Sequence, residues 1–134
     1  EVAKAASEVA VIPEVRMKLV ELQRSIAQNY SVVVDGRDIG TFVLPNADKK
    51  FYLTATLEER SRRRWLEMRE KGYDQSLEEV KKELEARDKN DMSRAFAPLR
   101  KAEDAILIDT TGKSIEQVAN EVCGYLRDIS ADGR

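Results

Sequence analysis

An arginine and an aspartate, Arg37 and Asp38, stand in a turn with two glycines, residues 35–41 (DGRDIGT). The turn follows residues 31–34 (SVVV), whose three consecutive valines predict a strand buried on both faces. In open α/β sheets, ligands bind at the carboxyl ends of the strands. A guanidinium matches phosphate geometry, and a carboxylate accepts from a sugar hydroxyl or a base amine, so the pair suits a nucleotide. An ordinary surface ion pair is the alternative.

A second group with nucleotide-binding chemistry consists of Arg87, Asp91 and Arg94, which are separated by four and then three residues. One helical turn or a compact loop would present these two guanidiniums and one carboxylate together. A phosphate plus a sugar would satisfy that set. The alternative is a helical ion pair between Arg87 and Asp91, which contributes only about 0.2–0.5 kcal/mol.

Four arginines follow the second expected strand and form a third group. On a helix, Arg60, Arg63 and Arg64 lie on neighbouring faces, whereas Arg62 points elsewhere. The first three would clamp a polyphosphate together. Neutralisation by nearby acids, which would make this a solvated charged face, is the alternative. The acids are Glu58, Glu59, Glu67 and Glu70.

Composition narrows the chemistry that these groups can support. The 134 residues include 23 Lys plus Arg against 25 Asp plus Glu, so no overall field attracts nucleic acid or an anionic membrane. Without histidine, and with Cys123 as the single cysteine, the chain has no zinc-type cluster, imidazole base or internal disulfide. No membrane-spanning run or signal peptide is present, which predicts a cytoplasmic protein.

Strands that alternate with helices predict an α/β fold with a parallel sheet flanked by helices. The segment from Asp88 to Arg100 is polar and predicts a loop or a short helix, and the strand from Lys50 is expected beside the strand from Ser31. The expected helices cover Val11–Ala27, Leu57–Lys71 with Thr56 as its N-cap, Ser76–Arg87 and Ile115–Leu126. The first of them is expected to carry an apolar stripe of Val15, Leu19, Leu22 and Ile26. The expected strands cover Ser31–Val34, Lys50–Ala55 and Ala105–Ile108.

One apparent phosphate-binding motif fails. Residues 111–114 (TGKS) follow an expected strand and open a helix, as the end of a P-loop would. A P-loop needs a glycine where Leu107 stands, inside that strand. The segment is therefore predicted to be a turn and a helix cap, and no other stretch of the chain fits a P-loop.

In their order along the chain, these segments resemble the bacterial cytidylate kinases, nucleoside monophosphate kinases that move the γ-phosphoryl group of ATP onto CMP or dCMP. The resemblance covers nearly the whole chain. The residues that carry it are 6–10 (ASEVA), 12–16 (IPEVR), 23–24 (QR), 35–41 (DGRDIGT), 58–60 (EER), 63–64 (RR), 87–88 (RD), Asp91, Arg94, 97–99 (APL) and 109–111 (DTT).

The resemblance implies roles for individual residues. Ser7, Arg16 and Asp38 match residues that face the cytosine ring, and Asp91 matches an aspartate that binds the sugar hydroxyls. Arg37 and Arg87 match arginines that hold the acceptor monophosphate, and Arg94 would reach towards the phosphates during transfer. A lid at about residues 60–95 would close over ATP, with Arg60, Arg63 and Arg64 at its start. Arg63, Arg87 and Arg94 would thus carry the catalysis, and no metal ligand is assigned.

The chain departs from this family in one large respect, because it lacks the family's N-terminal part with the P-loop. Residues 1–134 are therefore interpreted as the C-terminal part of a single P-loop nucleoside monophosphate kinase domain. ATP and Mg²⁺ are the expected cofactors, with Mg²⁺ bound mainly by the P-loop region, and the complete protein is expected to be a monomer. The chain alone is predicted not to turn over ATP. A degenerate relative, a non-catalytic nucleotide-binding module and an RNA-binding segment are the alternatives, and balanced charge counts against the last.

Overall fold

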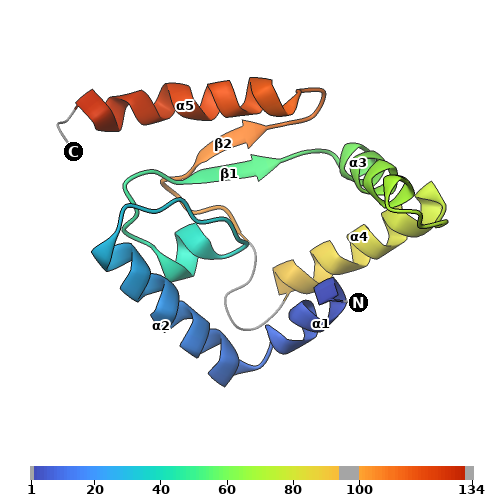
Figure 1. The fold of residues 1–134 in the computed structure, drawn as a ribbon, viewed down its shortest axis with the longest axis horizontal. Helices are drawn as coiled ribbons and strands as arrows, with labels where there is room; N and C mark the ends of the chain where they lie inside the picture. Colours follow the sequence, from blue (N-terminus) through green and yellow to red (C-terminus); the bar gives the residue numbers. More distant parts are fainter. Residues whose placement is uncertain (1, 94–99, 132–134) are drawn as a thin grey trace.

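A computed structural model describes residues 2–93 and 100–131 of the chain (Figure 1). The predicted α/β class, with parallel strands and flanking helices, is confirmed. The elements in chain order are α1 (Val2–Val9), α2 (Pro13–Asn29), the π-helix η1 (Ile39–Val43), β1 (Phe51–Thr54), α3 (Leu57–Glu70), α4 (Leu77–Ser93), β2 (Ile106–Asp109) and α5 (Ile115–Ala131).

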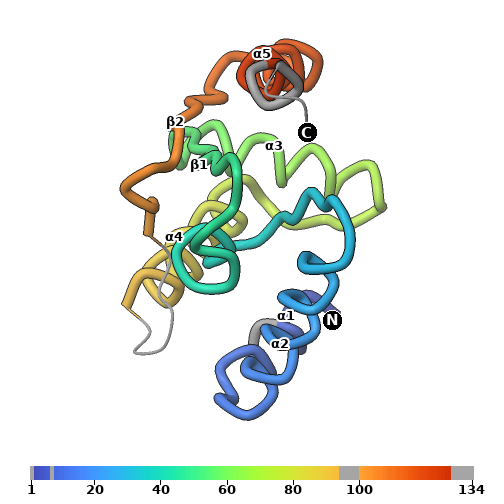
Figure 2. Tube along the Cα trace, turned by 90° about the vertical axis from the view of Figure 1, so that its left-hand side faces the viewer, coloured from blue at the N-terminus to red at the C-terminus, as the bar shows by residue number. Residues whose placement is uncertain are grey.

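Strands β1 and β2 form a parallel pair in which Phe51 lies beside Ile106 and Thr54 beside Asp109. Helix α5 runs along this pair (Figure 1), and the ring centroids of Phe51 and Tyr125 are 6.0 Å apart. A view turned by 90° shows α5 and α2 at opposite ends of the molecule (Figure 2). The two strands predicted around residues 50–55 and 105–108 are therefore present, and they pair with each other.

The strand predicted for residues 31–34 is wrong. These residues form no strand, and Val33 is 99% exposed. A strand needs a neighbour that exchanges backbone hydrogen bonds with it, and within the described residues β1 pairs with β2 alone. The valine run has the side chains of a buried strand without a backbone partner, so the expected pairing with the strand at residues 50–55 is also wrong.

The turn after this segment leads into the π-helix η1. The backbone N–H groups of Phe42 and Val43 both donate to the carbonyl oxygen of Asp38, at 2.9 and 3.2 Å. Helix α2 packs against η1 and presents its buried residue Val20. Asp38 is thereby held at the start of a closed, hydrogen-bonded loop.

Helices α3 and α4 pack against each other as a hairpin (Figure 1). The predicted N-cap of α3 is confirmed, because the Thr56 hydroxyl accepts from the N–H of Glu59 at 3.2 Å. Gly72, at a φ of +87°, follows the end of α3 in a conformation that glycine adopts easily. Helix α4 continues to Ser93, six residues beyond the predicted end at Arg87, so the polar segment from Asp88 begins as helix.

The segment after β2 is a turn and a helix cap, as predicted, and not a phosphate loop. Gly112 adopts a φ of +74° in the turn. The Ser114 hydroxyl then accepts from the N–H of Gln117 at 3.1 Å, while the Gln117 side chain accepts from the N–H of Ser114 at 2.8 Å. This reciprocal capping box fixes the start of α5.

The buried core is small, and many apolar side chains face outward. Val43, Val80 and Ile108 are almost fully buried. In contrast, the predicted apolar stripe of α2 is largely exposed, with Leu22 at 51% and Ile26 at 52%. Within the described part of the chain, no helix has the length and apolar character needed to cross a bilayer.

Candidate functional site

A cleft of about 280 Å³ lies where α1, the turn after α2 and the last turns of α4 meet. Helix α1, which the sequence patterns did not predict, contributes small side chains that leave the space open. The charged residues come from segments far apart in the sequence. The residues around the cleft include Ala3, Ala6, Ala10, Arg37, Arg87 and Asp91.

An ion pair between Arg37 and Asp91 joins two sides of this cleft. The Nε of Arg37 lies 2.5 Å from Oδ2 of Asp91. The Asp91 side chain is only 7% exposed, whereas that of Arg37 is 40% exposed. The carboxylate is therefore the buried partner and the guanidinium the accessible one.

Arg87 lies one helical turn before Asp91 on the same face of α4. Its Nε is buried and has no hydrogen-bond partner among the described residues. Burial, followed by repulsion from the Arg37 guanidinium, lowers the pKa of Arg87. Two guanidiniums close enough to repel each other, one of them with an Nε that has no partner among the described residues, suit the phosphate group of a ligand.

Asp38 and Arg16 form a separate, more buried ion pair between the turn and α2. Their side chains are only 9% and 11% exposed. The structure thus brings together two of the residues that the resemblance assigns to the base. Ser7 lies in α1, but its side chain is outside the described residues, and Arg94 lies outside them altogether.

Arg24 is a positioning residue to which the sequence patterns assigned no function. From α2 it donates through Nε to the carbonyl oxygen of Val43 and through an Nη to that of Phe42, both at 2.9 Å. Its guanidinium also lies over the Phe42 ring, 5.5 Å from the centroid. These contacts tie η1 to α2 and so hold the turn that carries Arg37 and Asp38. The sequence offered two signals for Arg24, its place among apolar positions of a helix and its membership of the residues 23–24 (QR) that carry the resemblance.

The four arginines at residues 60–64 of α3 are already paired in this structure. Arg62 bonds Glu59 and Arg64 lies 3.8 Å from Glu67, so both are neutralised within their own helix. Arg60 donates to the Ala55 carbonyl oxygen at 3.1 Å and pairs with Asp88 of α4. The predicted clamp of Arg60, Arg63 and Arg64 is therefore not assembled around one point here, and phosphate binding by these residues stays a prediction.

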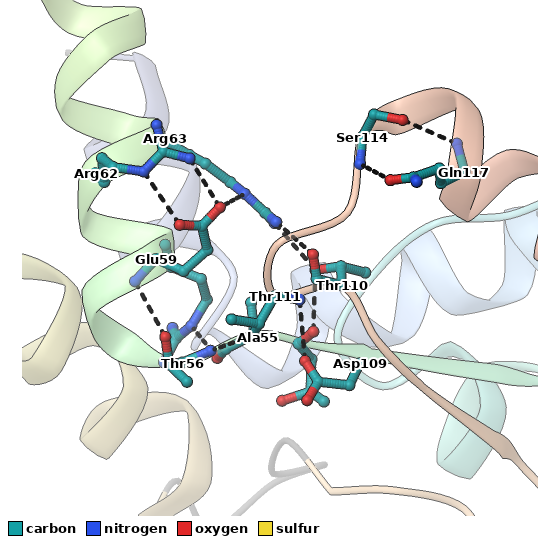
Figure 3. A network of polar contacts seen from close by, with 12 residues as sticks. Ala55, Thr56, Glu59, Arg62, Arg63, Asp109, Thr110, Thr111, Ser114 and Gln117 are labelled. Carbon is teal, nitrogen blue, oxygen red and sulfur yellow. Dashed lines mark hydrogen bonds and ion pairs between the residues drawn. The ribbon is translucent and has the colours of Figure 1, made fainter.

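Among these four arginines, Arg63 has the partner that lies farthest away in the sequence, Thr110 (Figure 3). Its two Nη groups donate to the hydroxyl and the carbonyl oxygen of Thr110, at 3.0 and 2.6 Å, and its Nε donates to Glu59. Thr110 is buried and bonds the carbonyl oxygen of Thr54 through both its N–H and its hydroxyl. Arg63 therefore fastens α3 to the carboxyl ends of both strands, a link that sequence spacing did not predict.

Comparisons with a family model and with curated proteins match most of this chain to one family. A family model described as cytidylate kinase matches residues 1–128. The chain is 53% identical over 128 residues to a cytidylate kinase of Halalkalibacterium halodurans, covering 96% of this chain and 58% of that protein. It is 55% identical over 122 residues to those of Caldicellulosiruptor bescii and Clostridioides difficile, covering 91% of this chain and 54% and 56% of theirs. The chain thus spans about half the length of the curated relatives it matches.

Proposed function

Because the chain belongs to the cytidylate kinase family, we propose that it forms the acceptor-binding and lid part of an enzyme that transfers the γ-phosphoryl group of ATP to CMP or dCMP. The products are CDP or dCDP. The observation that carries this proposal is the cleft in which Arg37, Arg87 and Asp91 meet, with a buried guanidinium donor of Arg87 unused among the described residues.

The acceptor monophosphate binds between the Arg37 and Arg87 guanidiniums. The phosphate supplies the negative charge that relieves their repulsion and an acceptor for the Nε of Arg87. Asp91, at the side of the same cleft, accepts from the sugar hydroxyls. Arg16, Asp38 and Ser7 select cytosine through polar complementarity, because a site built to hydrogen-bond a base rejects an analogue that leaves its groups unpaired.

Catalysis requires positioning and charge neutralisation more than a strong base, since the charge of the transferring phosphoryl group is spread over its oxygens. We assign the neutralisation to Arg87, Arg94 and Arg63, with Arg60 and Arg64 on the ATP side. For Arg60 and Arg63 this requires an exchange of partners, from Asp88 and Thr110 to phosphate oxygens. Such an exchange fits a lid, residues 60–95, that closes only over bound ATP and excludes water.

ATP enters as its magnesium complex and is a substrate. The part of the chain that the structure describes holds no group of three or more carboxylate, histidine or cysteine ligands that could bind a metal. No P-loop sequence is present in these residues to hold the β- and γ-phosphates. The chain alone accordingly does not turn over ATP. We further propose a cytoplasmic, monomeric complete enzyme.

The experiment joins this chain to the region of the H. halodurans cytidylate kinase that it does not match. The fusion should convert CMP and ATP to CDP and ADP, and the 134-residue chain alone should not. A folded fusion that phosphorylates AMP but not CMP would disprove the substrate assignment. A folded fusion that binds CMP without any turnover would instead support a non-catalytic nucleotide-binding protein.

A further inference from the structure

Two residues that the proposed function assigns to different parts of the acceptor are bound to each other. Arg37, assigned to the phosphate, and Asp91, assigned to the sugar, form the 2.5 Å ion pair at the cleft. Neither group can take up its proposed ligand fully while this pair persists. Resting on that proposed function, we propose that Asp91 determines specificity by making the site reject bare tetrahedral anions in favour of phosphates that carry neighbouring sugar hydroxyls.

The two side chains of this ion pair differ in burial, because Asp91 is buried and Arg37 is partly exposed. If Arg37 turns to an anion, the carboxylate of Asp91, with a side chain only 7% exposed, loses its ion pair and keeps, among the described residues, only the attraction of Arg87, with which it forms no ion pair. An unpaired buried charge is strongly unfavourable, whereas Arg37, at 40% exposure, has access to water in either arrangement. The penalty for separation therefore falls on Asp91.

A bare dianion cannot compensate this penalty, because it offers Asp91 no hydrogen-bond donor. Sulfate is such an anion at neutral pH, with four acceptor oxygens and no hydroxyl. A nucleoside monophosphate brings both requirements together, since its phosphate replaces Asp91 at Arg37 and its sugar hydroxyls replace Arg37 at Asp91. The Asp91 carboxylate thus competes with a bare anion for Arg37.

The same exchange predicts cooperation between the two halves of the acceptor. Cytidine, whose hydroxyls satisfy Asp91, should release Arg37 and so strengthen the binding of sulfate at the neighbouring position. By linkage, sulfate should strengthen cytidine binding by the same factor. A pair that merely holds α4 against the turn would give no such coupling.

The test compares sulfate binding by this 134-residue chain and two variants, using calorimetry at constant ionic strength. In Asp91→Asn the competitor loses its charge, and sulfate should bind about 10-fold more tightly than to the unmodified chain. The matched control is Asp88→Asn, which removes a carboxylate three residues away on α4 whose partner is Arg60, outside the cleft. It controls for loss of negative charge near the anion, and its sulfate affinity should change by less than about 2-fold.

The unmodified chain provides a second measurement that does not depend on how the variants fold. Saturating cytidine should raise its sulfate affinity by about 5-fold or more. Sulfate binding that is equal in Asp91→Asn and Asp88→Asn, absent from both, or unaffected by cytidine would overturn the proposal. Failure of the proposed function has a different signature, because the fusion protein would then form no CDP whatever the sulfate results.

Discussion

Two arginine-rich regions of this chain contain the same kind of side chain and differ in where its partners come from. On α3, Arg62 and Arg64 find their carboxylates one turn away on the same helix. In the cleft, Arg37 pairs with Asp91, which lies 54 residues further along the chain, and Arg87 keeps an Nε without a partner among the described residues. Arginines with acids one turn away on the same helix are neutralised locally. Arginines that meet only when distant segments fold together keep donors that can bind a ligand.

The largest effect expected from this difference concerns Arg87. In the active fusion protein, Arg87→Ala should lower kcat/KM for CMP by about 100-fold, because one or two charge-assisted hydrogen bonds of about 1.5–3 kcal/mol each are lost. Arg62→Ala, the matched control on α3, should leave kcat/KM within about 2-fold. Steady-state kinetics with CMP as the varied substrate makes the comparison. Equal losses in the two variants would remove the distinction between the regions.

Arg24 tests whether the cleft depends on the turn being held in place. Arg24→Ala removes two hydrogen bonds to the carbonyl oxygens of Phe42 and Val43 and should lower the free energy of unfolding by about 2 kcal/mol. Urea denaturation measures the loss, and hydrogen exchange at the amides of residues 42–44 should accelerate. Arg24→Lys keeps the charge but lacks the planar fork whose two nitrogens meet the two carbonyl oxygens, so most of the loss should persist. Full stability in Arg24→Lys would contradict this role.

Arg63 and Arg62 give a comparison inside α3, because both bond Glu59 but only Arg63 reaches Thr110. Arg63→Ala should lower the free energy of unfolding by about 1 kcal/mol through loss of the bonds to Thr110. Arg62→Ala should lower it by clearly less, because an exposed ion pair contributes little to stability. Thermal unfolding of the two variants side by side provides the measurement. A larger loss in Arg62→Ala would show that the link to Thr110 does not stabilise the fold.

The smallest expected effect is the pH dependence of Glu59. Its bonds with Arg62, and then with Arg63, lower the pKa of Glu59 below 4.5 in the folded chain. The lowered pKa makes its contribution to stability complete above pH 4.5 and lost as the pH falls through the folded-state value. Between the unmodified chain and Glu59→Gln, the difference in Tm should therefore shrink on acidification below pH 4.5. A difference that grows there would contradict the assignment.

Local signals in the sequence predicted much of the fold. Thr56 and Ser114 cap their helices as predicted, because a cap depends on residues three positions apart. The strand predicted at residues 31–34 was wrong because a strand also requires a neighbouring strand for its backbone hydrogen bonds. The side-chain types of the segment do not show whether such a neighbour is present. The π-helix η1 escaped prediction for a similar reason, since Arg24 stabilises it from another element.

In the candidate site, too, local spacing was predictable from the sequence and contacts between distant segments were not. The spacing of Arg87 and Asp91 predicted that one helical turn or a compact loop presents them together, and the structure places both on α4 beside the cleft. Spacing alone did not reveal that Asp91 binds Arg37, or that Arg63 turns to Thr110. Both contacts depend on how distant segments fold together, and the resemblance supplied roles for the residues but not their partners in the absence of ligand.

Nuclear magnetic resonance of the arginine Nε–H groups tests the central claim most directly, because each arginine reports its own hydrogen bonding. Adding CMP to the ¹⁵N-labelled chain should shift the Nε–H signals of Arg37 and Arg87, with the Arg87 signal moving downfield as its unused donor gains an acceptor. The signals of Arg62 and Arg64 should stay in place. Shifts confined to the α3 arginines, with Arg37 and Arg87 unchanged at saturating CMP, would contradict the account.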